Sequence, residues 1–377
     1  MIYLDNSATT PVEREVADKI YDMLTVKFGN PSSFHKAGLD SNAEVRSARS
    51  RLAGALSCEE EEIIFTSGGT EANNLAVFGA AIANRRRGKR IVTTEIEHES
   101  VLEAVNELEK QGFEVIRLSP DSDGNISPEA IENAVNSETI LVSMMYINNE
   151  VGSVLPVEAA ARAIKKAGAP ALVHIDCVQA FGKIPVKPKK LGADLLTVTA
   201  HKIHGPKGVG ALYIKKGVRI VPRQFGGAQE RKLRPGTEAS PLIAGFGKAV
   251  ELIPDLKIQQ EKIRELNLYA KERLTAIEGV KLNSGENASD YIINLYIPTF
   301  MTSQTVVQHF SSRYGICISS GSACAKGKKS HVLTAMRLSD KIIEHSVRIS
   351  FSRFNTKEEI DALAEAIKET AENYPGR

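Results

Sequence analysis

A lysine that follows an apolar segment is the first candidate for chemistry in this sequence. Residues 193–199 are rich in Leu, Val and Thr and predict a buried strand, after which come Ala200, His201 and Lys202. Burying an ammonium group is costly, and a lysine that loses its proton in such a place becomes a nucleophile. Lys202 is therefore a candidate nucleophile, with a surface lysine just past a strand as the alternative.

An acid follows an earlier apolar segment in the same way. Residues 171–175 lead into Asp176, and Gln179 comes three positions later. Ligands of open α/β sheets bind at the carboxyl ends of the strands, where a carboxylate can keep a pyridinium nitrogen protonated. The alternative for Asp176 is a helix N-cap.

Two glycines separate a further strand-like segment from a helix-forming one, in Thr66-Ser67-Gly68-Gly69-Thr70-Glu71. Glycines let backbone N–H groups approach an anion, and the start of a helix favours negative charge. The motif lacks the spacing of nucleotide-binding loops, so it indicates a different anion or, alternatively, a simple turn.

One histidine and one cysteine complete the candidates. His98 follows residues 90–96 and can stack on a flat ring and move protons, or have a structural role. Cys324 lies between small residues and glycines, with Lys326, Lys328 and Lys329 close behind. This composition favours an exposed, reactive thiolate over an incidental cysteine in a basic loop.

The elements that must position these residues alternate along the chain. Seven strand-like segments are separated mainly by helix-length amphipathic stretches, which predicts an α/β fold with a mainly parallel sheet covered on both faces. The link through Gly205, Pro206 and Gly208 is short, so one antiparallel strand is expected there. The segments are 62–66, 90–96, 113–118, 139–147, 171–175, 193–199 and 209–215.

The pattern changes after residue 255. Ile263, Leu266, Ala270 and Leu274 form the stripe of a long amphipathic helix, and short strands are expected at 291–297 and 346–351. Thr356 and Glu359 predict a capping box that opens a final helix. We predict a large domain over 15–255 and a smaller α+β domain formed by 1–14 and 256–377.

Composition excludes several classes of protein. The chain has 377 residues, a net charge of +2 and four scattered cysteines, so neither a disulfide framework nor a metal site is expected. It has no membrane-length apolar run and no secretory signal, which favours a cytoplasmic location. The basic run 85–90 is typical of a helix end, so direct nucleic-acid binding is not expected.

The anion-binding turn, the acid and the lysine fit one ligand, a phosphorylated aromatic aldehyde at the carboxyl edge of the sheet. At this point the sequence resembles the cysteine desulfurases of the NifS/IscS type, in the class V aminotransferase superfamily of fold-type I pyridoxal 5′-phosphate (PLP) enzymes. The resemblance runs nearly end to end, through residues 3–10, 29–35, 66–74, 97–98, 148–152, 174–179, 200–208, 234–237, 319–324 and 346–350.

The resemblance implies a role for each candidate. Lys202 would bond PLP and move protons, Asp176 would pair with the ring nitrogen, Gln179 would contact the ring hydroxyl, and His98 would stack on the ring. The phosphate would be held by Gly69, Thr70, Thr199 and His201, with Thr237 from the other subunit of a homodimer. Asn149, also close to the cofactor, and Arg348 would bind the carboxylate of L-cysteine, and Cys324 would take the sulfur as a persulfide.

Cys324 would then hand its sulfur to an acceptor protein, for iron–sulfur clusters, thio-cofactors or tRNA thiolation. Residues 325–331 depart from the family pattern, because they reach Val332-Leu333 sooner and are more basic. We therefore expect an acceptor other than the usual scaffold, such as a tRNA sulfurtransferase. The alternatives are a selenocysteine lyase or another class V aminotransferase-like enzyme, and, in another class, a non-catalytic sulfur-transfer scaffold.

Overall fold

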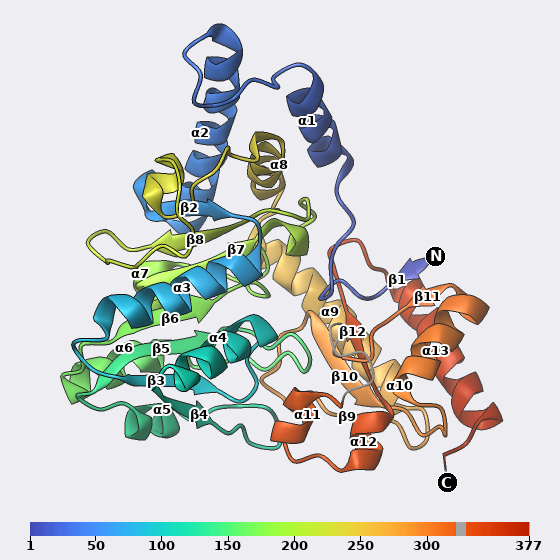
Figure 1. Ribbon diagram of the computed structural model, residues 1–377. Helices are drawn as coiled ribbons and strands as arrows, with labels where there is room; N and C mark the ends of the chain where they lie inside the picture. Colours follow the sequence, from blue (N-terminus) through green and yellow to red (C-terminus); the bar gives the residue numbers. More distant parts are fainter. Residues whose placement is uncertain (322–328, 377) are drawn as a thin grey trace.

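The computed structural model describes residues 1–321 and 329–376, and in these residues seven strands form one sheet (Figure 1). Its spatial order is β2-β8-β7-β6-β5-β3-β4. β8 is antiparallel to both of its neighbours, and the other pairs are parallel. The strands are β2 (Ile63–Thr66), β3 (Arg90–Thr94), β4 (Glu114–Leu118), β5 (Thr139–Met145), β6 (Leu172–Asp176), β7 (Leu195–Thr199) and β8 (Gly210–Ile214).

The predicted sheet is confirmed, including its antiparallel strand. Strand ends differ from the predicted ones by one or two residues. The largest corrections are of two residues: β7 begins at Leu195 rather than at 193, and β3 and β5 end at Thr94 and Met145 rather than at 96 and 147. Ile96 and Ile147 are buried in the loops that follow β3 and β5, although each of these strands ends two residues earlier.

Both faces of the sheet are apolar. Ile64 and Leu141 belong to a cluster with residues of α3 and α4, whereas their neighbours Phe65 and Val142 belong to the cluster on the other face. Since successive strand residues point to opposite faces, a strand with apolar residues at every position needs a layer on each side. The covering helices are α2 (Lys36–Leu56), α3 (Gly69–Asn84), α4 (Glu99–Lys110), α5 (Pro128–Ala134), α6 (Glu158–Ala167), α7 (Pro188–Leu191) and α8 (Ser240–Glu251), and α1 (Arg14–Thr25) packs on α8.

A smaller α+β part follows α8 (Figure 1). Its sheet has the order β12-β10-β9 and is antiparallel, and β11 pairs in parallel with β1 at the start of the chain. Thr356 and Glu359 form the predicted capping box of α13. The boundaries of the two domains stay a prediction. The elements are β1 (Ile2–Tyr3), α9 (Leu256–Thr275), β9 (Lys281–Leu282), β10 (Ile292–Tyr296), α10 (Ser303–His309), β11 (Ile316–Cys317), α11 (His331–Ala335), α12 (Asp340–Glu344), β12 (Ser346–Ser350) and α13 (Lys357–Asn373), with short 3-10 or π turns at Glu60–Glu62, Ala200–Lys202, Gln229–Lys232 and Phe310–Tyr314.

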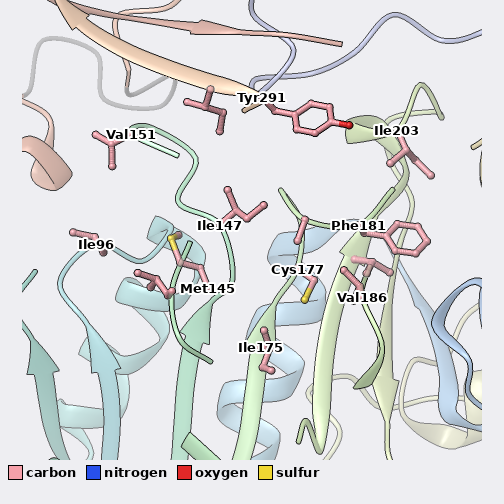
Figure 2. Packing of buried hydrophobic residues seen from close by; sticks show 14 of the residues in the cluster. Ile96, Met145, Ile147, Val151, Ile175, Cys177, Phe181, Val186, Ile203 and Tyr291 are labelled. Carbon is pink, nitrogen blue, oxygen red and sulfur yellow. The ribbon is translucent and has the colours of Figure 1, made fainter. Parts of the chain in front are cut away.

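An apolar layer joins the sheet to the smaller part. On the side of the large sheet, this layer contains Ile147, Ile175 and Phe181, at or just after the carboxyl ends of the strands. Tyr291, directly before β10, lies over them (Figure 2). The parallel strands β5, β6 and β7 end at one edge of the sheet, at Met145, Asp176 and Thr199. The smaller part thus closes over the edge at which ligands of such sheets bind.

No helix in residues 1–321 and 329–376 is long and apolar enough to span a membrane. The same residues contain no cluster of three or more His, Cys, Asp or Glu side chains arranged to hold a metal ion. The basic run 85–90 begins directly after α3 and ends in β3, where Arg90 pairs with Glu114 at 2.8 Å.

His174, in the middle of β6, makes the stability of the fold depend on pH. It is fully buried between Ser143 Oγ at 2.8 Å and Thr197 Oγ1 at 3.1 Å, and burial lowers its pKa to about 4. In the unfolded chain a histidine titrates at about 6.5, so the unfolded state binds more protons between these values. Stability is therefore lost as the pH falls through this window, by about 2 kcal/mol from this residue between pH 7.5 and pH 5.

The test is urea unfolding of the apoprotein at both pH values, for the wild type and for His174→Asn. The wild type is expected to lose about 2 kcal/mol more than the variant. Burial also raises the pKa of Glu97, to about 8, but this group is common to both proteins and cancels in the comparison. An equal loss in both proteins would contradict the assignment.

Candidate active site

A cavity of about 300 Å³ lies at the carboxyl edge of the sheet. Every predicted site residue lines it except Thr237 and Cys324. Thr237 is exposed, in the segment before α8, and Cys324 lies outside the described residues. The predicted residues that the fold brings together are Gly69, Thr70, His98, Asn149, Asp176, Gln179, Thr199, His201, Lys202 and Arg348.

Lys202 points toward Ser7 and Ala8, near the start of the chain, rather than into solvent. It ends a short 3-10 turn directly after β7, and its Nζ donates hydrogen bonds to the carbonyl oxygens of Ser7 and, at 2.8 Å, of Ala8. The side chain is half-buried and lines the cavity. The alternative of a surface lysine is therefore wrong, because hydrogen bonds hold the amine of Lys202 at the cavity.

Asp176 is held with its carboxylate at the bottom of the cavity. It is 5% exposed and ends β6, and no helix starts there, so the helix N-cap alternative is wrong. Its Oδ1 accepts from the Val178 amide at 2.9 Å, and its Oδ2 accepts from Asn73 Nδ2 at 2.7 Å. Both oxygens thus have fixed donors, which hold the carboxylate in one orientation.

His98 caps a helix, which is a structural role, and it also lines the cavity. It is the N-cap of α4, where its Nδ1 accepts from the Ser100 amide at 3.1 Å. Burial lowers its pKa, while Asp176 opposes the shift. A neutral imidazole whose Nδ1 accepts a hydrogen bond carries its proton on Nε2.

The end of the cavity that is predicted to bind an anion is built from the start of α3 and the end of β7. Gly68 has φ +154°, a conformation that favours glycine, and α3 begins at Gly69 with its free amides at the cavity. Thr199 donates its hydroxyl to Val209 O at 3.1 Å. Burial, together with neighbouring lysines, lowers the pKa of His201 to about 3, so this ring is neutral at pH 7.

Arg348 reaches the cavity from the middle of β12, and it is 1% exposed. Its Nη1 donates to the backbone oxygens of Asn149 at 2.8 Å and Gly321 at 3.0 Å, and its Nη2 pairs with Asp5 at 2.7 Å. Within the described chain its Nε has no hydrogen-bond partner. A buried, unsatisfied donor on a guanidinium is a place for a carboxylate.

Several residues of the site were not singled out from the sequence. Asn73 joins Asp176 to Ser100 Oγ, at 2.7 and 2.9 Å, and Ser100 Oγ lies 2.8 Å from His98 Nδ1. Asn73 is four residues after Gly69, on the same face of α3, and that spacing was the available signal. No spacing in the sequence indicated that Asp5 or the backbone carbonyls of Ser7 and Ala8 would belong to the site.

The thiols of two other cysteines are unsuited to nucleophilic chemistry. Burial raises the pKa of Cys58 to about 12, and burial raises that of Cys177 well above its ordinary value. The thiolate is the reactive form, so both residues stay inert near neutral pH.

The groups around the cavity fit a phosphorylated aromatic aldehyde. A helix start can take the phosphate, a carboxylate can take the ring nitrogen, an amine can take the aldehyde, and a neutral imidazole lies beside them. Asn73 Oδ1 is buried without a partner in the described residues, which leaves one further acceptor for such a ligand.

Comparison with known proteins agrees with this fold and site. Residues 2–363 match the class-V aminotransferase family, to which the chain therefore belongs and which implies PLP as cofactor. Cysteine desulfurase IscS of Methanosarcina thermophila is 43% identical over 376 residues, covering 98% of this chain and 91% of that protein.

Solved structures agree as well. A NifS-like protein is 37% identical, with a TM-score of 0.92 and 99% of each chain covered. SspA in complex with cysteine is 33% identical, with a TM-score of 0.82, covering 94% of this chain and 100% of that one. Within its family, the chain is a member of the cysteine desulfurases of the IscS/NifS type.

Proposed function

We propose that this cysteine desulfurase removes sulfur from L-cysteine with Lys202, Asp176 and His98 around the cofactor, and stores it as a persulfide on Cys324. The observation that carries the proposal is that one cavity brings together the amine of Lys202, the carboxylate of Asp176 and the ring of His98. A non-catalytic scaffold would not need these three groups in one place. The assignment of cysteine draws on the names of the similar proteins.

The residues around the cavity would hold PLP by its different groups. Lys202 would bond the aldehyde, Asp176 would hold the ring nitrogen protonated, and Gln179 would face the ring hydroxyl. The phosphate would be bound by the start of α3, at Gly69 and Thr70, with Thr199 and His201 beside it. When bound, PLP supplies an electron sink for bonds made and broken at the substrate.

Arg348 and Asn149 would orient the substrate. Arg348 is fixed by Asp5 and by two backbone oxygens, so its unpaired Nε–H is held in a constant direction. A carboxylate placed there gains a charge-assisted hydrogen bond in a buried setting. Lys202, which lines the same cavity, would move the proton at the substrate α-carbon.

The sulfur transfer balances without a further reactant. The Cys324 thiolate attacks the substrate sulfur, the carbon–sulfur bond breaks, and a sulfur–sulfur bond forms. The electron pair of the broken bond stays with the carbon fragment, which takes up protons and leaves as alanine. His98, neutral with its proton on Nε2, would supply a proton on the cavity side.

The experiment is a visible absorption spectrum of the purified protein before and after addition of L-cysteine, with sulfide and alanine assayed in parallel. A band at about 400 nm that changes with cysteine, together with both products, is expected. A band without sulfide in the presence of a thiol reductant would point to a transaminase, and no band after addition of PLP would overturn the proposal. Comparing kcat/KM for cysteine and selenocysteine separates the desulfurase from a selenocysteine lyase.

The proposed homodimer is supported by two exposed aromatic side chains, one of them in the segment that carries Thr237. Phe225, in the same segment, is 86% exposed, and Phe34, before α2, is 96% exposed. Large exposed aromatic residues are typical of interfaces. A dimer through this surface would let Thr237 of one subunit reach the phosphate of the other.

Phe225→Glu is expected to convert the dimer to a monomer and to weaken PLP binding by about tenfold or more, because the site would lose Thr237. The measurements are the molar mass by sedimentation and the dissociation constant for PLP by spectral titration. Phe300→Glu is the matched control, since Phe300 is also exposed, at 62%, but lies in the smaller part. A dimer with unchanged affinity in Phe225→Glu would contradict this surface.

The acceptor is a second protein that takes the sulfur of Cys324 onto a thiol of its own. The short and basic segment 325–331 supports an acceptor with an acidic docking surface, such as a tRNA sulfurtransferase rather than an iron–sulfur scaffold. Loss of the Cys324 persulfide is expected to be faster with that acceptor than with a small thiol. Equal rates would overturn this assignment, and a cytoplasmic location belongs to the same proposal.

A further inference from the structure

A second buried lysine lies beside the active site and has no role in the chemistry proposed above. Lys183 follows β6 in the segment that also carries Asp176 and Gln179, and it is 5% exposed. Together with Lys202 it lines a small separate cavity of about 20 Å³. The two lysines therefore approach the cofactor region from the same side.

The surroundings of Lys183 are unusual for a buried cation. Its Nζ donates to Gln179 Oε1 at 2.9 Å and lies 5.5 Å from the centre of the Tyr291 ring, which Figure 2 shows above the strand ends. No salt bridge links Lys183 to a carboxylate in residues 1–321 and 329–376. Burial, together with the nearby charges of Lys202 and Arg348, lowers its pKa to about 7. Such a position costs stability, which is typical of functional groups.

The contacts of Gln179 explain what Lys183 can do. Gln179 Nε2 donates to Ser7 O at 2.9 Å, while its Oε1 accepts from Lys183. An ammonium group can only donate and a carbonyl oxygen can only accept. The side-chain amide therefore has one allowed orientation. If it were reversed, its Nε2 would face the donor Lys183 Nζ, and its Oε1 would face the acceptor Ser7 O. Its second Nε2 hydrogen remains for a ligand in the cavity that Gln179 lines.

We propose that Lys183 is a positioning residue, which fixes Gln179 as a hydrogen-bond donor to an anionic ring oxygen of the bound cofactor. This inference rests on the proposed function, since it needs the cofactor ring to face Gln179. Lys183 does not touch the ligand. It acts by orienting the amide, because its Nζ donates the hydrogen bond that Gln179 Oε1 accepts.

The test compares the binding of two ligands by four proteins. The ligands are PLP and its analogue in which the ring 3-hydroxyl is methylated, so that this oxygen cannot be an anion. The proteins are the wild type, Lys183→Met, Gln179→Leu and the double variant. Dissociation constants come from spectral titration of the apoproteins, and the ratio for each protein is the constant of the analogue divided by that of PLP. Comparing this ratio between two proteins cancels the steric cost of the methyl group, which both share.

In the wild type PLP is expected to bind more tightly than the analogue, and Lys183→Met is expected to lower the ratio by about tenfold. In the Gln179→Leu background the same change is expected to lower it by less than about twofold, because the amide through which Lys183 acts is absent. Lys190→Met removes an exposed lysine of the same region and is expected to leave the ratio unchanged.

Thermal unfolding of the apoproteins separates positioning from a structural role. Lys183→Met is expected to keep or raise the unfolding temperature, because a buried cation is replaced by an apolar side chain of similar length. An unchanged ratio in Lys183→Met would overturn the inference while leaving the proposed function intact. If Lys183→Met fails to fold, an unchanged ratio in Gln179→Leu overturns it instead. A wild type that binds neither ligand would overturn the proposed function first.

Discussion

Lys202→Ala is expected to lower the turnover of cysteine by about a thousandfold or more, the largest effect of any single change in this protein. The variant loses both the amine that bonds the cofactor and the base that moves the proton at the substrate. Sulfide release under saturating PLP measures the effect. The visible band is expected to change as well, since the cofactor would be held only by noncovalent contacts.

The matched control for this change is Lys207→Ala, which removes an exposed lysine five positions further along. It is expected to keep nearly full activity. A Lys202→Ala enzyme with activity within about tenfold of the wild type would contradict the assignment of Lys202.

Cys324→Ala is expected to abolish sulfur transfer and leave cofactor binding intact. The site lined by Lys202, Asp176 and His98 does not depend on this thiol, so the band should still change when cysteine is added. Turnover is expected below about one hundredth of the wild-type value, because no nucleophile remains to take the sulfur. Activity and spectrum measured on the same sample separate these two expectations.

Cys317→Ala is the control, because Cys317 in β11 is the nearest other cysteine in the sequence and is half-buried. It is expected to retain activity. Sulfide release by Cys324→Ala at the wild-type rate would assign the enzyme a mechanism without a persulfide on Cys324, as in a lyase that releases sulfur directly.

The sheet could be predicted because several strands contain continuous apolar runs that are buried on both faces, such as Ile63-Ile64-Phe65 in β2. The two-residue strands β1 and β11 could not, because they are too short to show a period. Their pairing depends on contacts more than three hundred residues apart in sequence, from Ile2 to Ile316.

The cofactor residues could be placed for a similar reason. Asp176 and Lys202 follow apolar runs, and parallel strands bring their carboxyl ends to one edge. The residues that orient the site could not be predicted, because their partners are distant in sequence. Asn73 hydrogen-bonds to Asp176, 103 positions away, and Arg348 hydrogen-bonds to Asp5, 343 positions away. Lys183 could not be predicted for another reason, since nothing in the sequence around it indicates that its ammonium is buried.

The central claim is that sulfur leaves cysteine at this cavity and is retained by Cys324. The most direct measurement is a single turnover with sulfur-labelled L-cysteine and no acceptor, followed by peptide mapping without reductant. We expect one persulfide sulfur from the label on the peptide that contains Cys324, with an equal amount of alanine. Label on the peptides of Cys58, Cys177 or Cys317, or alanine formed with no label on the protein, would contradict it.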